Sequence, residues 1–135
     1  MDTGVLNTSD GNAVKTARIW TSGVNVDAAT VAATTSYTGA GFQPTHGVFM
    51  CVKDTFQSAG WGYTDGTGTG DDGWASNYLG VSDDYGRLSE SIIYNHGINI
   101  WLLGAVTWDI DGFTVAWTRL GLPTGTIQVR WVLYR

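Results

Sequence analysis

At 135 residues the chain has the length of one domain, and with 43% hydrophobic and 13% aromatic residues it can fill one core. Its net charge of −5 and its seven scattered Lys and Arg residues exclude generic binding to nucleic acid or to an anionic membrane surface, because both need clustered positive charge. The single cysteine, Cys51, excludes an internal disulfide, and its apolar neighbours predict a buried, inert thiol.

The N-terminal segment, residues 1–14, is polar and rich in turn-forming residues, and we expect it to be an arm that precedes a β domain at 15–135. It has neither the basic stretch nor the hydrophobic stretch of a secretory signal, so we expect the protein to be made in the cytoplasm. The longest apolar runs of the chain fall well short of a membrane span.

Three strands are predicted in the first part of the domain. The strand Lys15–Thr21 should end at a break formed by Ser22-Gly23. We interpret Val31–Tyr37 as a strand because it is rich in β-branched Thr, although the Ala residues of Asp27–Thr34 would also permit one or two helical turns. The run His46–Lys53 shows little alternation, which predicts a strand buried on both faces.

The middle of the chain is the most irregular part of the sequence. After a turn at Asp54–Gly60, the segment Trp61–Trp74 is expected to be an exposed loop, because five of its fourteen residues are Gly. Long loops of this kind are commonly functional or disordered. Trp61 and Trp74 flank the segment, so we expect aromatic packing to hold the base of the loop together.

Weaker signals follow this segment. We predict a short strand at Asn77–Val81 and a turn at Ser82–Gly86. The run Arg87–Tyr94 fits either helical or strand spacing, and we interpret it as a strand because its surroundings are β. Asn95–Gly97 has the composition of a turn.

The last third predicts a β-meander. A strand at Ile100–Ile110 leads to Asp111-Gly112, a dipeptide that favours a two-residue hairpin turn. Two alternating strands follow, and their expected inward-facing residues are Phe113, Val115, Trp117, Ile127, Val129, Trp131 and Leu133. In total, eight to ten short strands predict an all-β, single-domain antiparallel β-sandwich that is jelly-roll-like.

The acidic residues are the first candidates for chemistry. Asp65–Asp71 superficially resembles a calcium-binding loop, but it lacks the closing Glu, and Asp and Gly are also common turn formers. A glycosidase would need two carboxylates across a cleft, and an enzyme would be expected to depend on Asp71, Asp72, Asp109 or Asp111. With eleven Asp in the chain, some such pair always looks plausible, so the pattern carries little information.

Other catalytic patterns are weaker still. Ser-His-Asp catalysis would have to use His46 or His96, and the chain has no Gly-x-Ser-x-Gly elbow. Two His and one Cys give no zinc spacing. The run Gly66–Gly70 lacks the strand, helix and Lys of a phosphate-binding loop. We therefore predict a protein that is not an enzyme and that needs no metal and no cofactor.

Exposed Trp and Tyr beside Asp suit a sugar ligand or a neighbouring protein subunit, and we prefer the subunit. The candidate residues for a ligand or partner loop are Trp61, Tyr63, Asp65, Asp71, Asp72 and Trp74.

Two short motifs give the chain a resemblance. Gly41-Phe-Gln-Pro44 before a hydrophobic strand, then Asp111-Gly-Phe-Thr-Val115 and a closing strand Val129–Tyr134, resemble a group of small all-β proteins of tailed bacteriophages and prophages. The matched region covers about Gly39 to Tyr134. His46 departs from the small or basic residue expected after the Pro. The resemblance implies a virion protein, and it supplies no catalytic residues.

On this resemblance we expect a capsid decoration or cement protein that binds the major capsid protein at the virion surface. We also expect a dimer or trimer, because capsid surfaces offer local symmetry axes. The arm would contact the shell or a neighbouring subunit through Met1, Asp2, Thr3, Val5 and Leu6. The alternative is a tail or head fibre module that binds a carbohydrate receptor through the segment Trp61–Trp74.

Overall fold

The chain folds as an all-β sandwich, as the sequence predicts. The structure is a computed structural model that describes residues 18–53, 58–67, 72–78 and 83–135. The predicted arm, with Met1, Asp2, Thr3, Val5 and Leu6, lies outside these residues. Within them there are strands and no helix. The strands are β1 (Ile19–Asp27), β2 (Thr34–Thr38), β3 (His46–Lys53), β4 (Ser58–Thr64), β5 (Asp72–Tyr78), β6 (Asp83–Leu88), β7 (Ile92–Gly97), β8 (Ile100–Asp109), β9 (Gly112–Leu120) and β10 (Thr126–Tyr134).

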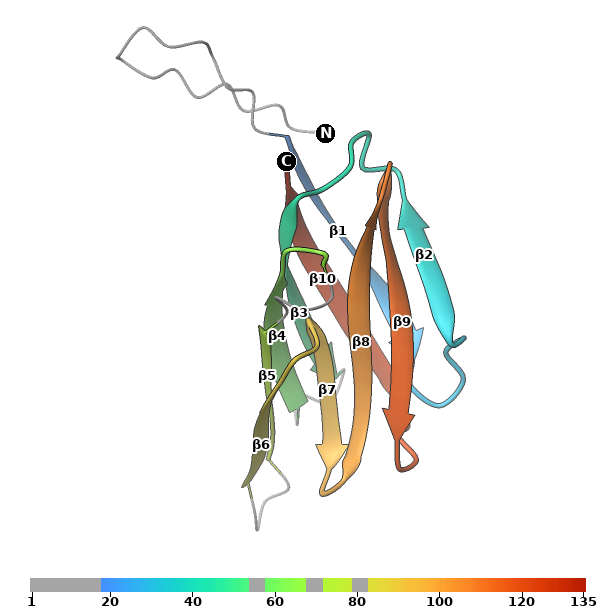
Figure 1. Cartoon of the computed structure of the whole chain (residues 1–135). Coiled ribbons are helices and arrows are strands. Elements are labelled where there is room, and N and C mark those ends of the chain that lie inside the picture. The colour runs from blue at the N-terminus through green and yellow to red at the C-terminus, as the bar shows by residue number, and fades with distance from the viewer. Residues whose placement is uncertain (1–17, 54–57, 68–71, 79–82) are drawn as a thin grey trace, which may run out of the picture.

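Two antiparallel sheets form the layers of the sandwich (Figure 1). One sheet has six strands in the order β1-β10-β3-β4-β5-β6, and the other has four in the order β2-β9-β8-β7. The first strand pairs with the last, and the second strand pairs with the next to last. The two ends of the domain are therefore wound together in the jelly-roll manner, while β3–β6 and β7–β9 are simple meanders.

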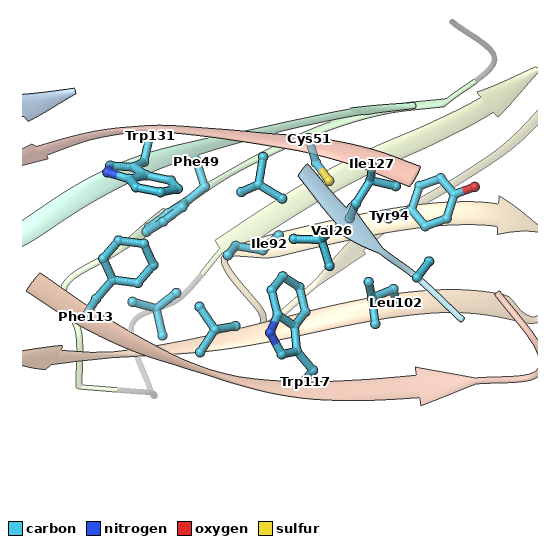
Figure 2. Packing of buried hydrophobic residues seen from close by; sticks show 14 of the residues in the cluster. Val26, Phe49, Cys51, Ile92, Tyr94, Leu102, Phe113, Trp117, Ile127 and Trp131 are labelled. Atoms are coloured by element: carbon cyan, nitrogen blue, oxygen red, sulfur yellow. The ribbon is translucent and has the colours of Figure 1, made fainter. Parts of the chain in front are cut away.

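The main core lies between the two sheets, where β9 and β10 contribute alternate side chains. The predicted inward residues Phe113, Val115 and Trp117 of β9 are all buried, as are those predicted for β10. Figure 2 shows Phe113 beside Trp131 and Phe49, with ring centroids 5.0 Å and 5.2 Å from that of Phe113 in edge-on geometry. The period-two pattern of the last third thus identified the centre of the core correctly.

The strand that is buried on both faces is β7, not β3. In β3 the side chains alternate, because Phe49 and Cys51 point into the core while Val48 and Met50 are exposed. Every residue from Ser91 to Asn95 is buried. One side of β7 packs into the main core, and the other side places Ile93 in a second cluster with Ala75 of β5 and Leu103 of β8.

Several predicted turns are strands in the structure. β1 continues through Ser22-Gly23, and a Cβ at Gly23 would lie 2.2 Å from the side chain of Arg130 on the neighbouring β10. The predicted turn at Ser82–Gly86 largely coincides with β6. Asn95–Gly97 belongs to β7, and the turn comes just after it, where Asn99 has a φ of 59°.

The hairpin between β8 and β9 turns one residue earlier than predicted. Asp109 pairs with Gly112, so the two turn residues are Ile110 and Asp111. The side chain of Asp111 is thereby placed to reach the loop between β2 and β3.

Candidate functional site

Strands β4 and β5 have their large side chains on the outside. In β4, Trp61 and Tyr63 are exposed, while Gly60 and Gly62 face inward. In β5, Trp74 is exposed and Gly73 faces inward. The prediction of one exposed loop over Trp61–Trp74 is therefore wrong, because the two strands take up half of this segment and only the part between Thr64 and Asp72 connects them.

The inward glycines are required by the close approach of β7. A Cβ at Gly62 would lie 2.2 Å from the carbonyl oxygen of Ser91, and a Cβ at Gly60 would lie 2.4 Å from that of Ile93. At Gly73 the corresponding distance, to the oxygen of Glu90, is 2.3 Å. Because the backbone at the start of β7 and just before it fills this space, bulky side chains of β4 and β5 can only point away from the core.

The outward side chains form an aromatic and apolar surface, which we call the aromatic face. It consists of Val48, Met50, Trp61, Tyr63 and Trp74, which are between 36% and 56% exposed. The register brings these residues together, since Met50 is opposite Trp61, and Trp61 is in turn opposite Trp74. Directly opposed side chains on one face of a sheet lie about 5 Å apart at Cβ, so the five residues form one continuous patch.

A shallow hollow lies at the β5 side of this face. It has a volume of about 380 Å³ and is lined by Trp61, Asp72, Gly73 and Trp74. The two indoles are neighbours across the β4–β5 pair, and Asp72 is opposite Tyr63. The hollow therefore has aromatic walls and a carboxylate at one end.

The outer face of the four-stranded sheet has the opposite character. Most of its exposed positions carry hydroxyl side chains, namely Thr34, Ser36, Thr107 and Thr118, and the half-buried Thr114 lies among them. The hydroxyls of Ser36 and Thr114 share a hydrogen bond of 2.7 Å, and Thr114 donates a second one of 2.7 Å to Asp109. The outer surface of the four-stranded sheet is thus mainly polar. On the described part of the six-stranded sheet the apolar character is confined to the β3–β5 part, because β10 presents the exposed polar residues Gln128 and Arg130.

Four of the six predicted site residues, Trp61, Tyr63, Asp72 and Trp74, come together on the outer side of β4 and β5. Asp65 lies beyond the end of β4, where its carboxylate accepts hydrogen bonds from the N–H and hydroxyl of Thr67. These bonds lower the pKa of Asp65. Asp71 lies outside the described residues. Among those described, no three His, Cys, Asp or Glu residues gather as metal ligands would.

The other candidates for catalysis have structural partners. Asp111 accepts hydrogen bonds from backbone N–H groups, and Asp109 accepts one from Thr114. His46 stacks on Tyr134 at 4.9 Å between ring centroids, and His96 Nδ1 is 2.8 Å from the hydroxyl of Tyr94.

Cys51 is fully buried, and this burial raises its pKa to about 12, so the thiol is a poor nucleophile at neutral pH. Among the hydrogen bonds of the described residues, none joins a Ser or Cys nucleophile to a histidine base.

Comparison with known proteins adds no relative: no family model, curated protein or solved structure matches the chain. The described residues also contain no helix that is long and apolar enough to cross a membrane.

Val48 and Met50 were missed by sequence reasoning as members of the site. The strand His46–Lys53 was predicted to be buried on both faces, so Val48 and Met50 were not considered as surface residues. A usable signal was present in the run Gly60-Trp61-Gly62-Tyr63, in which the smallest residue alternates with the largest. In a strand, that pattern puts aromatic side chains on one face and only backbone on the other.

Proposed function

We propose that the chain is a non-catalytic structural module that binds a protein surface through the aromatic face. One observation carries the proposal: β4 and β5 direct Trp61, Tyr63 and Trp74 outward, while most exposed positions on the opposite outer surface of the sandwich carry hydroxyl side chains. Contiguous apolar patches on one side of a soluble domain mark interaction sites.

The composition of the aromatic face favours a protein partner. Trp, Tyr and Met are enriched in the buried centres of protein interfaces, and Trp and Tyr supply many of the residues that dominate binding energy. Val48 and Met50 extend the patch by one strand beyond the aromatic residues. Aliphatic side chains at this position add apolar area that a protein surface can bury, and they offer no hydrogen bonds to a polar ligand.

We further propose that this surface docks on a bacteriophage particle, with the major capsid protein as partner and with the chain acting as a dimer or trimer. The support for this step is the resemblance of the Gly-Phe-x-Pro and Asp-Gly-Phe segments to small all-β virion proteins. The structure gives these segments a shared role, because Asp111 of the second segment binds the backbone at Gly41 of the first. The matched residues therefore act together as a structural unit.

The copy number of the chain in purified particles tests this step. Quantitative gel densitometry against the major capsid protein should give a ratio near one to one for a decoration protein. A ratio of a few per hundred would contradict the decoration proposal, and absence from the particles would contradict any virion role.

A second candidate function is a fibre module that binds a receptor glycan, and the hollow between Trp61 and Trp74 favours it. Indole rings can stack on the apolar face of a sugar, and the Asp72 carboxylate could accept hydrogen bonds from its hydroxyls. A fibre module would combine a low copy number with binding of the isolated chain to host-cell glycans. A copy number near one to one would contradict the fibre alternative, even if the isolated chain binds glycans. Glycan binding by the chain on such particles would also contradict the expectation that the capsid covers the aromatic face.

A further inference from the structure

The hollow on the aromatic face is built for a narrower class of ligand than the face as a whole. Its walls are the indoles of Trp61 and Trp74, which are 56% and 39% exposed. Gly73 lines it with backbone, because the side-chain position of this residue points inward, toward Glu90 and Ile93. Its polar side-chain group, apart from the indole N–H groups, is the carboxylate of Asp72.

Asp65 lies at the same end of the β4–β5 pair as Asp72, and Arg87 is opposite Trp74 on β6. The chain as a whole carries a net charge of −5. A cation is attracted to the face of an indole within about 6 Å of the ring, and a nearby carboxylate adds to that attraction. Net negative charge also raises the rate of encounter with a basic surface.

We propose that this hollow receives a cationic side chain, an arginine or a lysine, from the protein to which the aromatic face docks. The cation lies between Trp61 and Trp74, and its charge is directed toward Asp72. The inference rests on the proposed function, since it identifies the chemistry of the partner at one point of the same surface. Arginine should bind this hollow better than lysine, because the planar guanidinium stacks on indole and forms paired hydrogen bonds with a carboxylate.

A sugar fits the same hollow less well. A pyranose ring presents several hydroxyl groups, and each loses water on binding and then needs a partner. Of the four lining residues, Asp72 and the two indole N–H groups are the only side chains with hydrogen-bonding atoms. The hollow therefore matches a ligand with one charged group and a flat or aliphatic stem.

The experiment uses the full chain and N-acetyl-arginine methylamide as the probe, followed through the indole N–H signals of Trp61 and Trp74 by NMR. The signals are assigned with the variants Trp61→Phe and Trp74→Phe. We expect both to shift and to saturate with a dissociation constant on the order of 10 mM. Asp72→Asn should weaken binding about threefold, as expected for an exposed ion pair, whereas Asp27→Asn at the far end of the sandwich should not.

The other outcomes contradict the proposal. If methyl glucoside shifts the two indole signals and the arginine derivative does not, the hollow is a sugar site. No shift with either probe would also overturn it. So would binding of the arginine derivative that is as tight in Asp72→Asn as in the wild type and that does not weaken in high salt. Should Asp72→Asn fail to fold, the salt dependence of the wild-type chain decides. A negative result leaves the broader proposal open, because docking of the whole aromatic face on particles is measured separately.

Discussion

The carboxylate of Asp111 joins two loops that are seventy residues apart in the sequence by accepting a hydrogen bond from the backbone N–H of Gly41. Its other oxygen accepts one from the N–H of Gly39 at 3.1 Å, and its carbonyl oxygen accepts further bonds from Gly39 and Ala40. Gly39 and Gly41 have φ values of 105° and 72°, which other residues rarely adopt. The β8–β9 turn therefore determines the conformation of the loop that leads into β3.

Replacement of Asp111 should destabilise the fold. Both carboxylate oxygens accept an N–H, so Asp111→Asn turns one of them into a donor that faces another donor. We expect Asp111→Asn to lower the free energy of unfolding by about 1–3 kcal/mol, nearly as much as Asp111→Ala. Urea denaturation of the purified chain measures this change.

Asp109 provides the matched control on the same hairpin. Its carboxylate accepts one hydrogen bond, from the hydroxyl of Thr114, and an Asn carbonyl can accept the same bond. We expect Asp109→Asn to cost less than about 1 kcal/mol. Equal stability of Asp111→Asn and the wild type would show that the contact between the two loops does not support the fold.

A side chain at Gly62 should also destabilise the protein. In Gly62→Ala the added Cβ would lie 2.2 Å from the oxygen of Ser91 and 2.8 Å from its carbonyl carbon, so the backbone just before β7 would have to move. We expect a loss of about 2 kcal/mol or more in the free energy of unfolding, as for an overpacked core. Ala59→Ser adds one atom on the exposed side of the same strand and should change stability by no more than about 0.5 kcal/mol. A Gly62→Ala variant as stable as Ala59→Ser would contradict the close approach of β7.

The stability of the fold should fall as His96 becomes protonated. Burial, followed by the charge of Lys53, lowers the pKa of His96 below its usual value of 6.5, despite a smaller opposing effect from the carbonyl of Thr124. The unfolded chain therefore binds this proton more tightly than the folded chain does. Stability is full above about pH 6.5 and declines as the pH drops from there through the folded pKa.

The variant His96→Gln isolates this effect. Between about pH 8 and pH 5.5 the wild type should lose more of its free energy of unfolding than His96→Gln does, because the variant has no proton to bind at this position. Equal losses in both proteins would show that His96 is as easily protonated in the fold as in the unfolded chain.

The parts of the fold that were predictable are those with a single buried face. Phe113 and Trp131 sit in clean period-two patterns, and both strands were placed correctly with their inward sides. The extent of β4 and β5 was not predictable from composition, because glycine in quantity usually signals a loop. Here Gly60 and Gly62 mark a close contact between two sheets, which depends on where β7 packs.

Four residues of the candidate site could be predicted from the sequence, but their arrangement on paired strands could not. Trp61, Tyr63, Asp72 and Trp74 were selected for their chemistry, but on a loop, where no cross-strand neighbours can be assigned. The register of β3 with β4 adds Met50 and Val48 to the surface, and this long-range pairing has no local signal in the sequence. Asp109 and Asp111 were candidates only by residue type, and their hydrogen bonds serve the fold.

Cosedimentation with particles assembled without the chain tests most directly whether the proposed docking surface is the aromatic face. We predict that Trp61→Ala/Trp74→Ala binds such particles about 30-fold or more weakly than the wild type, since central Trp residues dominate interface energies. The control Ile110→Ala/Leu122→Ala, at loop positions 85% and 84% exposed, should bind like the wild type. With both variants folded by circular dichroism, wild-type binding by the Trp variant would contradict the account.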